Sequence, residues 1–320
     1  MKTRVGVMRG GMGSEYYVSL KTGANVLANL PRDQYEPHDI LVTRDGEWHI
    51  DGRRTTPEKL MQYVDVVLNG LHGEFGEDGK VQKLLEAFNI PYTGSTAVPS
   101  AIGMNKELTK KHLENVGIRV PRGTFAHHNE KVNDVIARIK KMIRAPYIVK
   151  PVSGGSSMGL TLVQIDNDLI PAIEKALAYG DKVLIEEYVR GREVTLSVID
   201  SMNGQGAYTT PPLEILLPED TIFDYDQKYT DTAHPVGPAR LSREQSRELE
   251  EAAFLAHRHL GARHYARYDF ILTDEGPCFL EVNTLPGLTS TSLLLKSLKL
   301  HGLPFSEFLD HILKLALQKK

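Results

Sequence analysis

The chain has 320 residues, enough for two or three hydrophobic cores, since domains usually contain roughly 100–150 residues. Its composition, with 41% hydrophobic and 25% charged residues, is that of an ordinary soluble globular protein, and the net charge of −3 gives no bulk attraction to nucleic acid or membranes. No apolar run approaches the roughly 20 residues that span a bilayer, and the single cysteine, Cys278, excludes a disulfide framework and favours a reducing cytoplasm.

The first block of the chain alternates strand-like and helix-like stretches, which is typical of an α/β protein. Residues 5–8 form an apolar strand that runs into a glycine turn, and Arg9 interrupts it too early for a signal peptide. Apolar residues at helical spacing predict a helix over 19–30, and a second apolar strand follows over 64–69. Proline and glycine close this block near Gly94.

A glycine-broken loop follows the second strand and carries His72, Glu74, Glu77 and Asp78 close together. Ligands of open α/β sheets bind at the carboxyl ends of strands, which favours a binding site here. The alternative is an acidic loop that caps the next helix, with Asp78 as its N-cap, and the two roles are compatible. Glu15 lies in a similar place, after the glycine turn that ends the first strand.

The second block opens with a helix that ends at Gly117, whose missing Cβ suits a left-handed C-cap. An apolar strand over 147–152 then leads into a loop of glycines and serines, 153–159. Such a loop can present backbone N–H groups to phosphates, and Lys150 adds a positive charge. It is not a Walker A sequence, and a flexible connection is the commoner role of a stretch of this composition.

The strand 182–189 joins the second block to the third. A strand beside a phosphate loop can offer backbone groups to adenine, with Glu193 free to reach ribose hydroxyls. An interdomain strand with exposed glutamates is the alternative, and this stretch alone favours it. Beyond it the sequence predicts an alternating strand over 192–200, a long helix over 242–260, a hairpin turning at Gly276 and a C-terminal helix.

The hairpin carries polar residues where a core strand would continue with apolar ones. If pairing is centred on Glu275, the period of two places four polar residues on one face of the sheet. The facing pairs are then Asp269 with Glu281 and Arg267 with Asn283. Opposed carboxylates repel, whereas a divalent cation between them reverses the sign, and Mg²⁺ prefers oxygen ligands. The alternative is a solvated hairpin face, which the apolar surroundings disfavour.

Eight stretches, taken in chain order, resemble one family along nearly the whole sequence. They are the glycine pair followed by "SEYYVSL", then "LHGEFGEDG", "PYTGS", "NK" at Asn105-Lys106, "VKPVSGGSSMG", "FDYDQKY", "ARYDF" and "LEVNTLPGLTSTSL". Each is weak alone, but together they match the D-alanine–D-alanine ligases of the ATP-grasp superfamily in order and approximate spacing.

The resemblance implies an α/β fold with the three-domain ATP-grasp architecture, α+β in its ATP-binding part. The expected domains are an N-terminal substrate domain over 1–94, a central domain over 95–186 and a C-terminal domain with the metal and second-substrate sites over 187–320. ATP would be gripped between the second and third domains. The resemblance also implies a cytoplasmic homodimer that supplies D-alanyl-D-alanine for peptidoglycan synthesis.

The resemblance further implies which residues hold ATP and metal. The phosphate-binding lysines would be Lys106, Lys150 and Lys228, with Ser157 in the phosphate lid, Glu186, Glu187 and Val189 on the adenine strand and Glu193 at the ribose. Asp269, Glu281 and Asn283 would hold two Mg²⁺ ions, for which Mn²⁺ can substitute.

For the substrates, the resemblance implies that one D-alanine is activated by ATP as an acyl phosphate and a second attacks it with its amine. Glu15 would hold the first ammonium, with Ser156 and Tyr229 linked to that glutamate and His72 near the carboxylate. Arg267 and the N–H of Gly287 would hold the oxyanion, and Ser292 and Leu293 would bind the second carboxylate. A lid formed by 223–232 and 153–159 would keep water away.

The chain departs from the family's usual residues at Gly13, Tyr17 and Val152, and its hairpin turn is one residue shorter. A related ATP-grasp ligase acting on another carboxylate and amine would keep the ATP residues and change the substrate ones. A D-alanyl-D-lactate ligase would usually lack Tyr229. A non-catalytic nucleotide-binding module, the alternative from another class, need not keep both metal carboxylates and Arg267.

Overall fold

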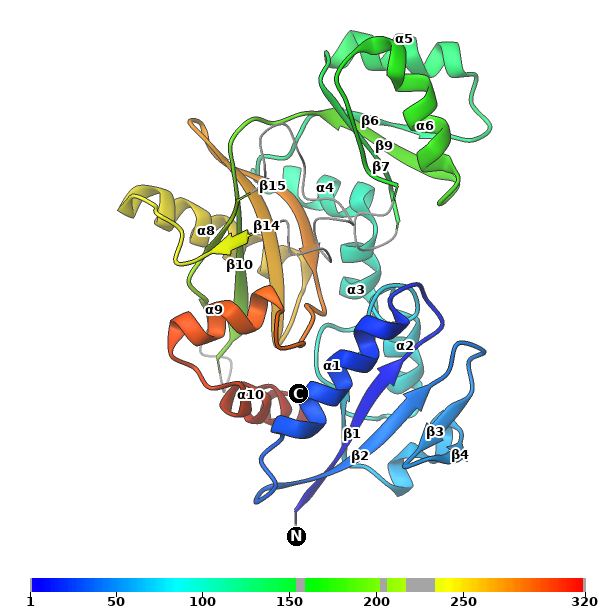
Figure 1. The fold of residues 1–320 in the computed structure, drawn as a ribbon, viewed down its shortest axis with the longest axis vertical. Coiled ribbons are helices and arrows are strands. Elements are labelled where there is room, and N and C mark those ends of the chain that lie inside the picture. The colour runs from blue at the N-terminus through cyan, green and yellow to red at the C-terminus, as the bar shows by residue number, and fades with distance from the viewer. Residues whose placement is uncertain (1, 154–158, 202–205, 217–233, 319–320) are drawn as a thin grey trace.

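The computed structural model describes residues 2–153, 159–201, 206–216 and 234–318. They form three β-sheets with helices packed around them, and the N-terminal and central sheets lie at opposite ends of the molecule (Figure 1). The predicted α/β class is confirmed. Nothing in this part of the chain is a helix long and apolar enough to cross a membrane.

The N-terminal sheet provides one edge of the site. Its elements are β1 (Thr3–Gly10), α1 (Tyr16–Asn29), β2 (Tyr35–Val42), β3 (Trp48–Ile50), β4 (Arg53–Thr55), η1 (Pro57–Gln62), β5 (Val66–Asn69) and α2 (Lys80–Ala87). The strand order is β4-β3-β2-β1-β5, with β1 parallel to β2 and β5. Because β1 and β5 are parallel and Met8 pairs with Asn69, the loops that follow them leave the sheet at the same edge.

The start of α2 corrects one expectation. Gly79, with a φ of 88°, is the N-cap, so the prediction that Asp78 takes this position is wrong by one residue. The carboxylate of Asp78 accepts N–H groups from Phe75 and Lys80, each at 3.0 Å, and so stabilises the turn before the helix. A left-handed cap is available here because glycine has no Cβ to clash.

The central sheet has a core of its own. Its strands β6 (Gly123–His127), β7 (Tyr147–Pro151), β8 (Thr161–Val163) and β9 (Lys182–Glu187) pair antiparallel in the order β6-β9-β7-β8. Helices α5 (Val132–Met142) and α6 (Leu169–Leu177), the latter preceded by η2 (Asp166–Asp168), pack on the sheet. Ile139, Ile173 and Tyr147 meet in this core, which explains why the helices are amphipathic.

The C-terminal sheet is the largest. Its elements are β10 (Arg192–Asp200), β11 (Ala207–Thr209), β12 (Leu213–Leu216), β13 (His234–Val236), α8 (Arg243–Leu260), β14 (Tyr265–Thr273), β15 (Gly276–Asn283), α9 (Leu293–His301) and α10 (Phe305–Leu317). The order is β13-β12-β10-β14-β15, with β11 also paired to β10. Ser242 and Gln245 form a reciprocal capping box at the start of α8, and Gly261 ends it with a φ of 68°.

The β14–β15 hairpin confirms the predicted facing pairs, Asp269 with Glu281 and Arg267 with Asn283. The turn itself differs, because Thr273 pairs with Gly276 and leaves a two-residue turn. The register then shifts between Asp269 and Phe270, where Phe270 pairs with Phe279 and Leu280 has no partner in the ladder. This bulge restores the pairing at the polar end, as an extra residue in one strand does.

The C-terminal helices α9 and α10 pack into the hydrophobic core of the N-terminal sheet. Buried residues of β1 and β5 share one cluster with Tyr265, Phe308 and Ile312, and α10 lies beside α1 (Figure 1). Conversely, α3 (Ala97–Met104) and α4 (Lys106–Glu114) contact α8, and Leu113 of α4 lies in the core of the C-terminal sheet. The division of the chain at 94 and 186 stays a prediction, and these contacts cross it.

We expect Phe308→Ala to lower the free energy of unfolding by about 3–5 kcal/mol, because it empties a fully buried position. The ring of Phe308 also meets that of Tyr265 edge-to-face at 5.4 Å, a contact the alanine lacks. Urea denaturation gives the value. The control is Leu317→Ala, at the exposed end of the same helix, for which a change of about 0.5 kcal/mol or less is expected. Equal losses for both variants would contradict the shared core.

Candidate active site

Loops from distant parts of the sequence converge where β1, β5 and β15 end. His72, after β5, reaches the backbone carbonyl of Leu285, after β15, at 3.1 Å. The amide of Asn25 in α1 donates to the carbonyl of Leu288 at 2.6 Å. These contacts hold the loop 284–292 against the N-terminal sheet, so residues from both ends of the chain line one site.

His72 is fixed in a single tautomer. Its Nδ1 faces the Leu285 carbonyl, which only accepts, so Nδ1 carries the hydrogen. Its Nε2 then accepts from the hydroxyl of Thr22 at 2.8 Å. Burial lowers the pKa of His72, although the nearby charge of Glu15 opposes this. A neutral, oriented imidazole results.

Glu15 and Glu77 lie on either side of Gly73. The N–H of Gly73 donates to Glu77 Oε2 at 2.6 Å, and a Cβ on Gly73 would overlap Glu15 Oε2. Burial raises the pKa of Glu77 to about 8, and the charge of Glu15 adds to the effect, while the Gly73 N–H and Arg267 oppose it. Glu77 therefore favours its neutral form at neutral pH, and the negative charge of the pair rests on Glu15.

Arg267 and Asp269 form a buried, two-bond ion pair on the site-facing side of the hairpin. Arg267 Nε donates to Asp269 Oδ1 and Nη2 to Oδ2, both at 2.9 Å. The Thr195 hydroxyl also donates to Oδ1 at 2.5 Å. Burial opposes the charge of Arg267, but Asp269 and Glu281 raise its pKa. Arg267 thus stays charged and in one orientation.

The donor set at the polar end of the hairpin fits a hard divalent cation. Asp269 Oδ1 accepts two hydrogen bonds and Oδ2 accepts one, which leaves a lone pair of Oδ2 for a metal. Glu281 is paired opposite it, and Asn283 follows on the same face. Oxygen ligands of this kind suit Mg²⁺. The described residues contain no group of three or more His, Cys, Asp or Glu side chains that could hold a metal, and the hairpin itself supplies two carboxylates and one amide.

The loop after β15 brings Gly287 against Ser292. A Cβ on Gly287 would lie 3.0 Å from Ser292 Oγ, so the absence of a side chain lets the two approach. Asn283 Oδ1 accepts the N–H of Leu285 at 3.0 Å and starts the turn. Ser292 is the N-cap of α9 and accepts the N–H of Thr289 at 3.0 Å, and Leu293 is the first helical residue. Backbone N–H groups at a helix start favour a carboxylate ligand.

A buried cluster of alternating charge lies at the base of the central sheet. Lys150 Nζ lies 2.5 Å from Glu186 Oε1, and Lys110 Nζ lies 2.6 Å from Glu186 Oε2. Burial opposes the charge of Glu186, but the two lysines lower its pKa. Burial likewise opposes the charge of Lys150, but Glu186, Glu281 and Glu193 raise its pKa. The carboxylate of Glu281 on the hairpin therefore interacts electrostatically with Lys150 of this cluster.

The other predicted adenine-strand residues lie at the end of β9. The carboxylate of Glu187 is bound by Arg122 through the backbone N–H, Nε and Nη2 at 2.9–3.0 Å, so its side chain is engaged within the protein. Val189 lies just beyond the strand and is half-buried. Glu193 lies on β10, paired with Ile215 and Ile271. Because the carboxylates of Glu186 and Glu187 are bound by lysines and by Arg122, we expect these two residues to contact adenine through their backbone groups.

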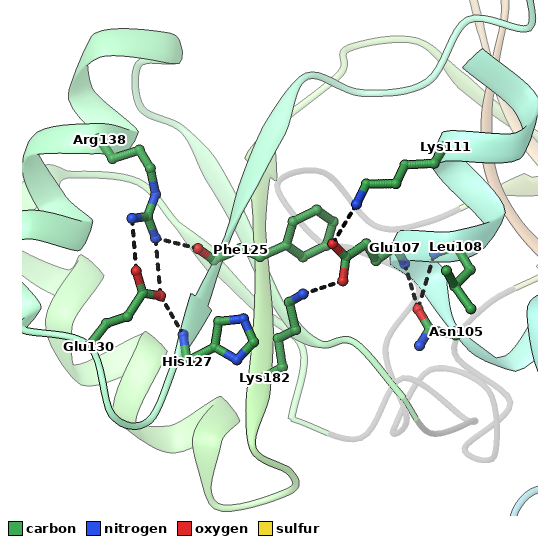
Figure 2. Close-up of polar contacts among 9 residues, drawn as sticks. All are labelled: Asn105, Glu107, Leu108, Lys111, Phe125, His127, Glu130, Arg138 and Lys182. Atoms are coloured by element: carbon green, nitrogen blue, oxygen red, sulfur yellow. Dashed lines mark hydrogen bonds and ion pairs between the residues drawn. The ribbon is translucent and has the colours of Figure 1, made fainter. Parts of the chain in front are cut away.

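Lys106 is the first residue of α4 and lies next to Val152, which follows β7. Its N–H donates to the carbonyl of Val152 at 3.1 Å, and Asn105 caps the helix through Glu107 and Leu108 (Figure 2). Glu107 then joins Lys111 of the same helix to Lys182 of β9, whose ammonium lies over the Phe125 ring at 4.8 Å (Figure 2). A neighbouring bidentate pair, Arg138 with Glu130, fixes the edge strand β6. The first turn of α4 is thus anchored to the central sheet.

Some predicted residues lie outside the described ones: Ser156, Ser157, Lys228 and Tyr229. Three further residues belong to the candidate site: the sequence reasoning did not mention Thr195 or Lys110, and it placed Glu77 in the binding loop without a role of its own. Thr195 holds Asp269, Glu77 lies beside Glu15, and Lys110 shares Glu186 with Lys150. Lys110 could have been found, because it lies one helical turn after Lys106, whereas the contact of Thr195 depends on the pairing of β10 with β14.

Comparison with known proteins identifies relatives along the whole chain. The family models described as D-ala D-ala ligase N-terminus and C-terminus match residues 50–95 and 113–314. The D-alanine–D-alanine ligase of Halalkalibacterium halodurans is 35% identical, covering 99% of this chain and all of that protein. The enzyme of the same name from Geobacter sulfurreducens is 36% identical over 97% of this chain and 93% of its own.

Solved structures of related enzymes share the fold. The VanG D-Ala:D-Ser ligase from Enterococcus faecalis superimposes with a TM-score of 0.88 at 30% identity, covering 99% of this chain and 100% of that one. The D-alanine–D-alanine ligase of Bacillus anthracis complexed with ATP gives a TM-score of 0.80 at 31% identity, covering 98% and 97% of the two chains. The three-sheet arrangement is therefore that of an ATP-grasp ligase.

The raised pKa of Glu77 predicts a pH-dependent stability. Its neutral form stabilises the fold fully below the unfolded pKa, and this contribution is lost as pH rises through about 8. We expect Glu77→Gln to gain at least about 1 kcal/mol over the wild type between about pH 5 and about pH 8. Urea denaturation across this range measures it, with Glu74→Gln on the exposed side of the loop as control. A pH-independent difference would contradict the assignment.

Proposed function

Because the chain belongs to the D-alanine–D-alanine ligase family, we propose that it uses ATP to join two D-alanine molecules into D-alanyl-D-alanine. The observation that carries the proposal is the meeting of two sets of groups. Glu15, His72 and Glu77 form a polar cluster, and Arg267 of the hairpin interacts with Glu77 of this cluster as well as with Asp269 and Glu281. A site with a carboxylate for an ammonium, beside cations for phosphate, suits the activation of an amino acid by ATP.

In the first half-reaction, Glu15 binds the ammonium of the first D-alanine. Because Glu77 is neutral, the site offers the ammonium one negative charge, that of Glu15. The substrate carboxylate attacks the γ-phosphate of ATP and forms D-alanyl phosphate with release of ADP. Lys106 and Lys150 position and neutralise the phosphates, with Lys228 and the loop around Ser157 as the resemblance implies. Positioning and charge neutralisation supply most of the catalysis in phosphoryl transfer.

We assign Asp269, Glu281 and Asn283 as the ligands of Mg²⁺. When bound, the metal supplies neutralisation of the negative charge on the phosphates. Asp269 keeps one open lone pair for it, while Arg267 and Thr195 fix its carboxylate plane. Arg267 therefore has two tasks, since the same guanidinium that orients Asp269 also faces the substrates.

In the second half-reaction, the amine of the second D-alanine attacks the acyl carbon and phosphate leaves. The oxyanion is bound by Arg267, through the Nη1 that Asp269 does not take, and by the N–H of Gly287. Ser292 and the start of α9 at Leu293 bind the carboxylate of this second substrate, where helix-terminal N–H groups favour an anion. Ser156 and Tyr229 complete the first-substrate site as the resemblance implies.

The cellular setting belongs to the same proposal. A ligase of this kind supplies the D-alanyl-D-alanine end of the peptidoglycan precursor in the cytoplasm, which the single buried cysteine suits. We propose a homodimer, which light scattering of the purified chain tests directly. A monomer would leave the catalytic proposal intact.

Phosphate release with separation of the products tests the function. We expect turnover that requires ATP, Mg²⁺ and D-alanine, gives D-alanyl-D-alanine, and stops when EDTA removes the metal. D-serine and D-lactate, each supplied with D-alanine, measure the second site, and we expect the dipeptide of D-alanine to dominate. A main product containing D-serine or D-lactate would contradict the proposed specificity for D-alanine. If no substrate is turned over, the protein is better explained as a non-catalytic nucleotide-binding module.

We expect Glu281→Gln to lower turnover by about 100-fold or more while the protein stays folded, because it weakens a metal ligand and leaves Asp269 less compensated. The matched control is Glu275→Gln at the turn of the same hairpin, whose exposed carboxylate pairs with Arg119 at 2.8 Å. Turnover and circular dichroism are measured for both. Wild-type activity in a folded Glu281→Gln protein would show that the hairpin carboxylates hold no catalytic metal.

A further inference from the structure

Helix α4 carries a second lysine, Lys110, whose side chain reaches Glu186 on β9 of the central sheet. Lys110 lies four residues after Lys106, so the two lie on the same face of the helix. Lys110 is only 7% exposed, and its ammonium donates to Glu186 Oε2 and to the carbonyl of Pro121, each at 2.6 Å. Its contacts are with the protein, not with the space where the phosphates are expected.

Glu186 is shared. Its other oxygen lies 2.5 Å from Lys150, and Glu186 is 2% exposed. The buried group therefore contains two ammonium ions and one carboxylate, with a net charge of +1. With Lys150 alone, Glu186 would form a neutral pair, because a close carboxylate cancels most of the field that a lysine presents to a more distant anion.

We propose that Lys110 is a positioning residue for ATP, which neutralises Glu186 so that the charge of Lys150 is available to the phosphates. The proposal rests on the proposed function, in which Lys150 binds ATP. The charges of Glu281 and Glu193 also act on Lys150. Each reduces the positive field that Lys150 presents to the phosphates, so neutralisation of Glu186 by Lys110 matters more. A lysine that touches no substrate would thereby set the affinity of one that does.

The alternative is that Lys110 only satisfies the Pro121 carbonyl and supports the fold. The two roles differ in what they predict for nucleotides of different charge. An electrostatic role weakens ATP and leaves uncharged adenosine unaffected, whereas a distorted site would weaken both. The charge balance also predicts that removal of the Glu186 charge compensates for the loss of Lys110.

The experiment compares Lys110→Met with Lys111→Met, which removes the same charge from the exposed neighbouring position. Calorimetry measures ATP binding, and inhibition of turnover measures adenosine binding. We expect Lys110→Met to raise the Kd of ATP by about tenfold or more, equivalent to ~1.4 kcal/mol, and to leave the adenosine inhibition constant within about threefold. Lys111→Met should leave both unchanged.

The double variant Lys110→Met/Glu186→Gln restores the net charge of +1 on Lys150. We expect it to recover most of the ATP affinity lost in Lys110→Met, while Lys110→Arg should lose little. Equal weakening of ATP and adenosine, or a double variant weaker than the single one, would overturn the proposal. If Lys110→Met does not fold, the double variant and Lys110→Arg still decide the matter. Failure of the wild type to bind ATP would refute the proposed function instead.

Discussion

The opposition of Asp269 and Glu281 across the hairpin is the constraint on which the rest of the site depends. Two carboxylates on paired strands repel, and Arg267 compensates one of them with a buried two-bond contact. The bulge at Leu280 makes the opposition possible. Without it, the two-residue turn would pair Asp269 with Leu280. The bulge also allows Phe279 to face the core while Glu281, two residues later, faces the site.

The proposed substrate site depends on contacts between the two ends of the chain. His72 is oriented by Leu285, and Thr22 binds both His72 and the N–H of Leu288. Helices α9 and α10 also complete the core of the N-terminal sheet, and Leu285 and Leu288 anchor the loop between β15 and α9 in the same core. Gly287 and Ser292, proposed to bind the oxyanion and the second carboxylate, thus lie next to a well-packed core, as precise positioning requires.

Buried charges in this protein occur in groups and never singly among the residues discussed. Lys110, Glu186 and Lys150 share one network, and Arg267 and Asp269 form another. A buried ion without a partner is strongly destabilising, so each catalytic charge needs a neighbour that keeps it ionised yet leaves it available. Glu77 shows the opposite solution, since burial near Glu15 keeps it neutral.

The sequence by itself determined the α/β class, the main strands and helices, and the two polar pairs of the hairpin, because side-chain period and glycine turns are local signals. The family motifs supplied the residues that are proposed to bind ATP and substrate. Only the tertiary structure decided that Glu186 points between two lysines, that Thr195 holds Asp269, and that α10 packs beside β5 and α1. These contacts join residues that lie far apart in the sequence, 76 positions for Lys110 with Glu186 and 74 for Thr195 with Asp269. Their geometry depends on strand order and on burial, neither of which a local pattern encodes.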